Sequence, residues 1–123
     1  MFVLMCDNKE ITQTIDNENS LPIYKLKEGV PEKYIPKDLF LDRLQVSSLE
    51  LIKWIEDRVF PEERTDCDTL LKELGLDRYD AWEIAKKTRG TLMTDYFWLK
   101  VNEDDKYETH SIRGLAGIPP VQF

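Results

Sequence analysis

The chain has 123 residues and a formal net charge of −7, and 41% of its residues are hydrophobic and 33% charged. This length fits one domain with a hydrophobic core, and the composition lies in the ordinary globular range, which argues against disorder. The negative charge argues against direct binding to nucleic acid, because such binding needs a basic face. It leaves open a basic protein partner or mimicry of nucleic acid by an acidic face, although solubility is the simplest explanation.

Two cysteines and one histidine limit the metal and redox chemistry of the chain. Cys6 and Cys67 form no Cys-x-x-Cys pair, and His110 alone cannot complete a zinc site with them. We therefore expect two reduced, buried thiols and no metal or other cofactor. The apolar residues 1–6 lack the basic region and the length of a signal peptide, and no stretch approaches the roughly eighteen apolar residues of a membrane span. These features predict a cytoplasmic protein with no membrane contact.

The beginning of the chain predicts short strands. Residues 2–6 are almost entirely apolar, residues 11–15 alternate between apolar and polar, and the Asp-Asn pair between them suits a tight turn. We expect these two segments to pair as a β-hairpin. Residues 21–26 predict a third short strand, and Pro22 indicates the edge of a sheet, because proline cannot donate a backbone hydrogen bond.

A connector and then a helix follow these strands. Residues 27–38 contain one glycine, two prolines and no periodic pattern. The helix begins at a capping box formed by Ser47 and Glu50, and an apolar face at helical spacing supports it. Because proline cannot continue a helix, Pro61 should end this one just after Phe60.

Two further helices are predicted from the signals at their ends. Thr65 or Asp66 caps a short helix, and Gly75 follows it at the left-handed position of a Schellman ending. Asp80 caps the third helix, which should run to about Arg89. The middle of the chain is therefore expected to be helical.

The densest apolar and aromatic run, residues 91–101, predicts a buried strand at the centre of the core. A charged turn separates it from residues 107–112, whose alternation predicts a partner strand in a second hairpin. Residues 113–123 contain two glycines and two prolines and should form an irregular tail. With strands at both ends and three helices in the middle, the sequence predicts one α+β domain over residues 1–123.

No constellation of residues predicts catalysis. The five glycines fall in no phosphate-binding pattern, and His110, expected in a strand, has no serine elbow motif with which to form a triad. Adjacent carboxylates are plentiful, but they lie on expected helix surfaces and turns, where they serve as caps or solvated charge. Asp104 and Asp105 could weakly hold a divalent cation, although a charged turn is the simpler interpretation. We therefore expect no enzymatic activity.

Trp54 and Trp82 are the candidate protein-interface residues. Trp54 lies beside the main apolar face of its helix, and tryptophan is enriched in the hot spots of interfaces. A base-stacking platform that combines the tryptophans with Tyr96 and Phe97 is an alternative. Such platforms carry interleaved basic residues along a groove, whereas the surroundings here are acidic or mixed. Core packing or a protein interface is therefore favoured.

Arg58 and Arg64 lie on either side of Pro61 and could converge on Asp95, the single acid in the aromatic run. A structural ion pair is the expected arrangement. The alternatives are an anion-binding pair of arginines and a small enzyme site that uses Asp95 with one of them.

Several motifs in residues 48–99 carry a family resemblance. They are Leu51-Ile-Lys-Trp-Ile-Glu-Asp-Arg-Val-Phe-Pro-Glu-Glu-Arg64, Leu70-Leu-Lys-Glu-Leu-Gly-Leu76 and Gly90-Thr-Leu-Met-Thr-Asp-Tyr-Phe-Trp-Leu99. This run resembles the N-terminal accessory region that precedes the kinase core in some Firmicutes HipA-like proteins. The motif positions of that family correspond here to Trp54, Arg58, Pro61, Arg64, Leu71, Gly75, Asp95 and Trp98.

The resemblance departs from the family in two places. Tyr96 and Phe97 stand where the family has a single aromatic pair, and the sequence ends at Phe123, before the lobe that carries ATP-binding and catalytic residues in that family. The resemblance therefore implies an accessory module without kinase activity, of the kind that contacts another protein or domain. It also suggests an origin in a bacterial or phage-related mobile element.

Three functions follow from these observations as expectations. The first is a non-enzymatic protein-interaction or regulatory module that acts on a kinase-like protein partner. The second is an acidic, phage-type inhibitor that mimics nucleic acid and occupies the groove of a nucleic-acid-binding protein. The third is a small enzyme built on Asp95. The sequence leaves the oligomeric state open.

Overall fold

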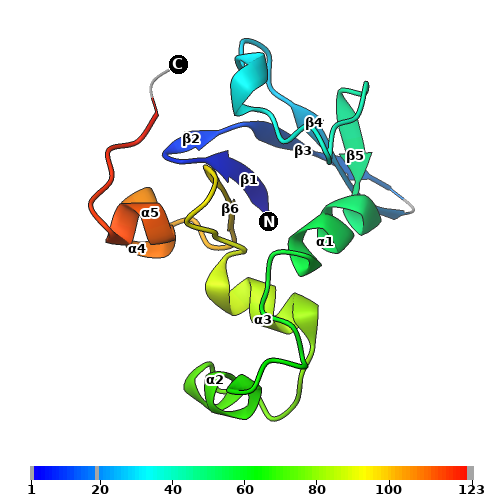
Figure 1. The fold of residues 1–123 in the computed structure, drawn as a ribbon. Coiled ribbons are helices and arrows are strands. Elements are labelled where there is room, and N and C mark those ends of the chain that lie inside the picture. Colours follow the sequence, from blue (N-terminus) through cyan, green and yellow to red (C-terminus); the bar gives the residue numbers. More distant parts are fainter. Residues whose placement is uncertain (1, 19, 122–123) are drawn as a thin grey trace.

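The structure is a computed structural model that describes residues 2–18 and 20–121. In these residues, helices occur together with two small antiparallel sheets, which confirms the predicted α+β class (Figure 1). The strands are β1 (Val3–Cys6), β2 (Lys9–Glu10), β3 (Thr12–Asn17), β4 (Ser20–Leu26), β5 (Gln45–Ser47) and β6 (Phe97–Lys100). The helices are the 3₁₀ turn η1 (Glu32–Tyr34), α1 (Ser48–Glu56), α2 (Cys67–Glu73), α3 (Ala81–Thr88), α4 (Tyr107–His110) and α5 (Ile112–Leu115).

The first sheet has the strand order β2-β1-β6, so β1 is its central strand. β1 runs antiparallel to β6, and Leu4 lies opposite Leu99. The prediction that residues 91–101 form the central strand is wrong. Only residues 97–100 of that run form a strand, and this strand, β6, lies at the edge of the sheet.

Other parts of the chain cover the outer edge of β6. The N–H of Leu99 donates to the carbonyl of Arg89 (2.7 Å), and the guanidinium of Arg58 donates to the carbonyl of Phe97 (2.9 Å). An edge strand with unpaired backbone groups would be free to pair with another chain. These two contacts close the edge and bind the helical region to the sheet.

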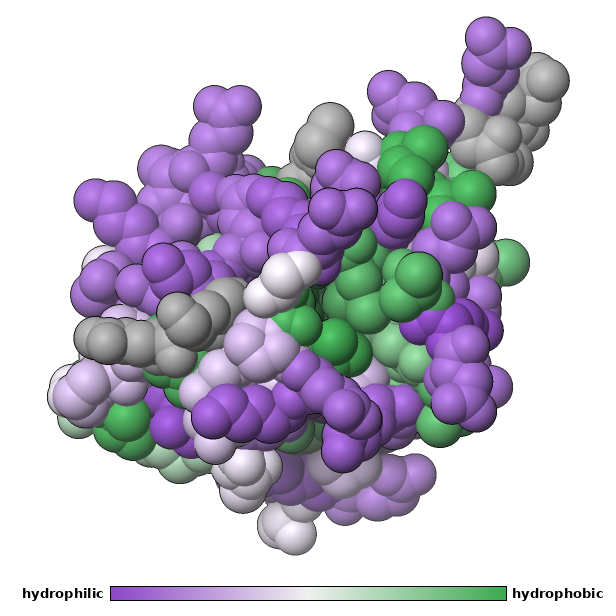
Figure 2. Space-filling model, turned by 90° about the horizontal axis from the view of Figure 1, so that it is seen from above, coloured by the Kyte–Doolittle hydropathy of each residue, from purple (hydrophilic) through white to green (hydrophobic). Residues whose placement is uncertain are grey.

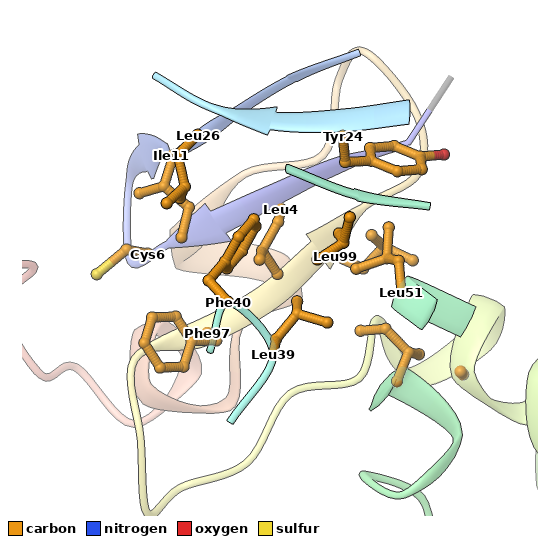
Figure 3. Packing of buried hydrophobic residues seen from close by; sticks show 13 residues of the cluster. Leu4, Cys6, Ile11, Tyr24, Leu26, Leu39, Phe40, Leu51, Phe97 and Leu99 are labelled. Carbon is orange, nitrogen blue, oxygen red and sulfur yellow. The ribbon is translucent and has the colours of Figure 1, made fainter. Parts of the chain in front are cut away.

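The two paired strands β1 and β6 are buried on both faces, which explains their nearly continuous apolar sequences. On one face, Leu4 packs with Leu51 of α1 in the main core. On the other, Met5 and Trp98 pack against Tyr107 of α4. The main core draws residues from both sheets, from α1 and from the loop before β5 (Figure 3).

The second sheet has the strand order β3-β4-β5. β4 is therefore central, and the expectation that Pro22 marks an edge strand is wrong. β5 pairs only with the segment from Ile23 to Lys25 of β4, so Pro22 lies beyond its end and needs no N–H for that pairing. The short strand β5 was not predicted, because its three residues carry no alternating pattern long enough to detect.

The expected hairpin turn at Asp7 and Asn8 is observed, but the return strand that pairs with β1 is shorter than predicted. β1 turns back into the two-residue strand β2, whereas β3 pairs with β4 in the other sheet. Ile11 is the crossing point, because its N–H donates to the carbonyl of Leu4 (3.0 Å) and its carbonyl accepts from the N–H of Lys27 (2.9 Å). Ile11 thus links the two sheets. Two hydroxyls of β3 add to this link: that of Thr12 accepts from the N–H of Leu4 (3.1 Å), and that of Thr14 donates to the carbonyl of Phe2 (3.0 Å).

The capping box predicted for the first helix is confirmed. The hydroxyl of Ser47 accepts from the N–H of Glu50 (3.2 Å), and the carboxylate of Glu50 accepts from the N–H of Ser47 (3.1 Å). The helix ends at Glu56, four residues earlier than expected. The N–H of Arg58 bonds to the carbonyl of Ile55 (2.9 Å), and this tighter i→i+3 bond turns the chain before Pro61 is reached.

The predicted ends of the other two helices are also observed, except that the side chain of Asp66 makes no capping hydrogen bond and contacts Arg64 instead. Asp66 is the N-cap residue of α2, and Gly75 (φ 76°) ends that helix with a Schellman bond from the N–H of Leu76 to the carbonyl of Leu71 (2.9 Å). The carboxylate of Asp80 accepts from two N–H groups at the start of α3 (3.0 and 3.2 Å).

The predicted C-terminal hairpin is wrong, because residues 107–112 form α4 and the start of α5. Tyr107 and Ser111 are buried while the residues between them are not, and this spacing of four is helical. The alternating sequence fits a strand equally well, so packing of Tyr107 on the sheet decides the conformation. The expected irregular tail, residues 113–123, is therefore helical at residues 113–115.

Replacing Gly114 with alanine is expected to force α4 and α5 apart. A Cβ at Gly114 would lie 1.9 Å from the carbonyl oxygen of Tyr107 and 2.9 Å from the Cα of Glu108. We expect the free energy of unfolding, measured by urea titration, to fall by about 1–3 kcal/mol, as in other overpacked sites. Leu115→Ala, at a neighbouring exposed position, should change it by less than about 0.5 kcal/mol. A Gly114→Ala protein as stable as the parent would contradict this contact.

No helix in the described residues is long and apolar enough to cross a membrane.

Candidate functional site

The ion pair expected at Asp95 forms with Arg58. Two nitrogens of the Arg58 guanidinium contact the two carboxylate oxygens of Asp95 at 2.6 and 2.7 Å, and its Nε donates to the carbonyl of Gly90 (2.7 Å). The side chain of Arg58 is 7% exposed and that of Asp95 is 28% exposed. Arg58 therefore joins the turn after α1 to the segment before β6, and its donors are engaged within the fold.

Arg64 does not take part in this cluster. Its Nε contacts Asp66 at 2.6 Å, and both side chains are about half exposed. The prediction that Arg64 could share Asp95 with Arg58 is therefore wrong.

Trp54 belongs to the packing around Arg58. The Arg58 guanidinium lies 4.6 Å from the centre of the Trp54 ring, and the indole N–H donates to Asp38 (2.9 Å). The ring also meets Phe97 edge to face at 6.1 Å. These contacts give Trp54 a role inside the fold, so it is the weaker of the two interface candidates.

A second buried ion pair, which the sequence did not reveal, joins Arg89 to Asp105. Asp105 is 5% exposed, and one of its oxygens accepts from Nε of Arg89 (2.7 Å) and from the N–H groups of Val101 (2.9 Å) and Asn102 (3.0 Å). Nε2 of His110 lies 3.3 Å from the other oxygen. Burial alone would raise the pKa of Asp105, but these hydrogen bonds and the charge of Arg89 hold that pKa well below its usual range.

This arrangement corrects the expected position of His110 and also bears on the cation site that Asp104 and Asp105 could have formed. His110 lies in helix α4 rather than in a strand. Asp105 is turned toward Arg89 while Asp104 is exposed, so the two carboxylates do not face one cation. Throughout residues 2–18 and 20–121, no group of three or more His, Cys, Asp or Glu side chains is placed to hold a metal ion.

Asp7 is the most deeply buried acid among the described residues. It is 0% exposed and has a positive φ of 47° in the turn between β1 and β2. One carboxylate oxygen accepts from the N–H of Val121 (2.9 Å), and the other lies 3.8 Å from Nε of Arg113 without a hydrogen bond. Burial raises the pKa of Asp7, although Val121 and Arg113 oppose that shift. The acid thus ties the C-terminal segment to the first hairpin.

The two thiols are free and buried, as predicted. Burial raises the pKa of Cys6 to about 12, and burial also raises the pKa of Cys67. A thiol acts as a nucleophile through its thiolate, so neither cysteine is activated for chemistry at neutral pH.

Trp82 lines an open apolar groove of about 380 Å³ between the β3–β4 pair and helices α1 and α3. Its ring meets Phe2 edge to face at 5.4 Å, and Leu21 in the groove is 56% exposed. We call this the Trp82 groove; its lining is Phe2, Thr14, Asp16, Leu21, Pro22, Tyr24, Ser48, Leu51, Ile52 and Trp82. Asp16 is the only charged side chain among the described residues of that lining. Figure 2 shows a largely hydrophilic face that is interrupted by exposed hydrophobic residues.

Sequence reasoning found only Trp82 of this groove. Leu21 and Phe2 come from segments predicted as strands, and their exposure depends on how the two sheets meet at Ile11, which no local pattern reveals. The one feature of the sequence that could have indicated the groove is an apolar residue, Leu21, next to a proline in a short strand.

No protein family, curated protein or solved structure matches the chain. The resemblance of residues 48–99 to the accessory region of HipA-like proteins therefore stays a prediction.

Proposed function

We propose that the chain is a non-enzymatic protein-interaction module that binds an apolar segment of a protein partner in the Trp82 groove. The groove is the observation that supports this proposal. Open apolar surface is costly to leave in water, and exposed patches with a polar surround mark interaction sites in soluble proteins. Trp82 supplies an aromatic side chain of the type enriched in interface hot spots, and Leu21 adds exposed aliphatic surface beside it.

The charge of the chain suggests the chemistry of the partner. Asp16 lies in the lining, Glu18 follows it as an exposed residue, and the chain carries a net charge of −7. An apolar segment flanked by basic residues would complement this surface and associate faster through electrostatic steering. A kinase-like protein is the partner class that the resemblance in residues 48–99 suggests.

The acidic-inhibitor alternative has less support. Mimicry of nucleic acid needs free carboxylates on one face, whereas several acids here are used inside the fold. They are Asp7, Glu50, Asp66, Asp80, Asp95 and Asp105, which serve as caps or as partners of arginines and backbone groups.

Replacing Leu21 with aspartate is expected to weaken partner binding without unfolding the protein. The tagged chain, with a photo-crosslinking residue at position 52 in the groove, would be used to capture partners from the source cells. A charge at this exposed site should weaken binding at least about tenfold, the equivalent of 1.4 kcal/mol.

Leu41→Asp is the matched control, because Leu41 is 67% exposed and lies outside the groove. It should retain every crosslinked partner, and both variants should keep the urea midpoint of the parent. If no captured protein is lost by Leu21→Asp and kept by Leu41→Asp, the groove is not the binding site.

A further inference from the structure

A second cavity, of about 650 Å³, lies at the other end of the helical region. It is bordered by the turn after α1, the last turn of α3 and the two short helices α4 and α5. Its volume falls in the range of about 300–1,000 Å³ that small-molecule sites occupy. The cavity shares no described lining residue with the Trp82 groove, so an inference about it does not depend on the proposed function.

The lining combines an apolar surface with polar and charged groups. Its apolar part consists of Val59, Phe60, Leu92, Ile112 and Leu115, and three threonines and His110 supply hydroxyl and imidazole groups. Leu115 is 67% exposed and Ile112 is 39% exposed, although both are aliphatic. Apolar side chains left open beside polar groups suit a ligand that has an apolar body and a polar head.

The charged residues that line this cavity are mostly basic, whereas those of the whole chain are mostly acidic. Acids outnumber bases by 24 to 17 in the sequence, yet the described residues of the lining include a single acid, Asp57. They include four cationic residues, namely Arg58, Arg64, Lys87 and Arg89. The lining is therefore richer in cations than the chain as a whole, although acids just outside it pair with Arg58, Arg64 and Arg89.

The four cations divide into two kinds. Arg58 and Arg89 are committed to Asp95 and Asp105 and hold the walls in place. Arg64 bonds to Asp66 through Nε, and its side chain is 53% exposed, so its two terminal nitrogens are available. Lys87 is exposed and forms no ion pair with any described residue. Arg64 and Lys87 can therefore bind a ligand without any loss of the fold's own contacts.

We propose that this cavity binds a small organic anion, in which a phosphate or carboxylate head contacts Arg64 and Lys87 and an apolar body packs on Phe60, Leu92 and Ile112. Arginine and lysine are the usual partners of such heads, and the arginine fork can bind them through two nitrogens. The apolar body supplies the affinity that a solvent-exposed charge pair alone would not provide.

The test uses two probes that carry both an anionic head and an aromatic body, phenyl phosphate and benzoate. Inorganic phosphate is the control that has only the head, and benzyl alcohol is the control that has only the aromatic body. Binding to the full chain would be followed at low salt by NMR chemical shifts of the backbone amides. We expect both aromatic anions to bind more tightly than either fragment, with shifts at residues 87–92 and 109–115. Tighter binding of phenyl phosphate than of benzoate would assign a phosphate ester as the preferred head. Tighter binding of benzoate would assign a carboxylate.

Charge reversal at the two available cations locates the site. Arg64→Glu and Lys87→Glu should each weaken binding of the aromatic anions by about tenfold or more, as expected for loss of a hydrogen bond to a charged group. Lys25→Glu, which makes the same charge change on an exposed residue of β4, should alter binding less than about twofold. Both cavity positions are exposed, so both variants should stay folded. Lys87→Glu should keep the urea midpoint of the parent, and Arg64→Glu should lower the free energy of unfolding by no more than about 1 kcal/mol through loss of its pair with Asp66.

Three results would overturn the proposal. The first is no saturable binding of either aromatic anion. The second is equal binding of benzyl alcohol, which would leave the charges without a role. The third is an equal loss of binding in Lys25→Glu and in the two cavity variants, which would indicate a nonspecific effect of net charge.

Discussion

Replacing Arg58 with alanine is expected to destabilise the protein by about 3 kcal/mol, near the lower end of the range for breaking a buried ion pair. The variant loses the two contacts to Asp95 and the hydrogen bonds to the carbonyls of Gly90 and Phe97. It also removes the cation that lies over the ring of Trp54. Because Asp95 is 28% exposed, water can partly replace its lost partner, which keeps the cost from rising further.

Urea unfolding followed by tryptophan fluorescence would measure this loss. Arg58→Lys should be intermediate, because lysine keeps the charge but cannot make a bidentate contact or reach both carbonyls. Arg64→Ala is the matched control, since its exposed pair with Asp66 should contribute less than about 1 kcal/mol. Similar losses from Arg58→Ala and Arg64→Ala would show that the buried pair is not the main connection between α1 and β6.

The helix ends could be predicted because their chemistry is local. A hydroxyl or carboxylate at the N-cap and a glycine beyond the last turn satisfy backbone groups within a few residues, so Ser47, Asp80 and Gly75 identify the helix boundaries without knowledge of the rest of the fold. The end of α1 is the exception. There Arg58 turns inward to reach Asp95, a contact 37 residues away in sequence, and the helix stops before Pro61.

Strand pairing could not be predicted in the same way. The sequence predicts strands at residues 2–6 and 91–101, of which the second is a strand only at residues 97–100. Which strand is central depends on contacts between distant parts of the chain. Alternation at 107–112 was misleading because Tyr107 and Ser111 fit both a period of two and a helical spacing of four. Burial of Tyr107 against Trp98 selects the helix, and that contact is not visible in a local pattern.

The ion pairs illustrate the same distinction. An isolated acid among aromatic residues must find a partner, which drew attention to Asp95. The sequence offers Arg58 and Arg64, on either side of Pro61, as its candidate partners. Asp105 was hidden in a run of charged residues, where solvated charge is the simplest expectation. Its burial follows from the fold of the loop after β6, which points two backbone N–H groups at one carboxylate oxygen.

Replacing Asp105 with asparagine is expected to cost about 3–5 kcal/mol at pH 7, because it leaves Arg89 buried without its anion. The side chain of Arg89 is 14% exposed and that of Asp105 is 1% exposed, so water cannot readily replace the lost contact. Asparagine also places an N–H₂ group where an oxygen now faces donors from Arg89 or the backbone. Asp104→Asn, at the exposed neighbouring position, should change the free energy of unfolding by less than about 0.5 kcal/mol.

The effect of Asp105→Asn should depend on pH in a defined direction. The pKa of Asp105 is lower in the folded protein than in the unfolded chain, where it is about 3.9. The ionised carboxylate therefore stabilises the fold fully above that value, and the stabilisation is lost as the pH falls through it toward the folded pKa. Urea titrations from pH 7 to pH 3 should show the largest difference between parent and variant at neutral pH and a smaller one below about pH 4.

His110 must be separated from this effect, because its Nε2 lies 3.3 Å from the same carboxylate. A His110→Gln variant has no imidazole to titrate at this position. The difference in unfolding free energy between that variant and the double variant that also carries Asp105→Asn should therefore keep the same decline toward low pH. A decline that vanishes in the His110→Gln background would assign the acid sensitivity to the histidine. A decline that remains assigns it to the pair between Asp105 and Arg89, the contact that holds the loop after β6 to the end of α3.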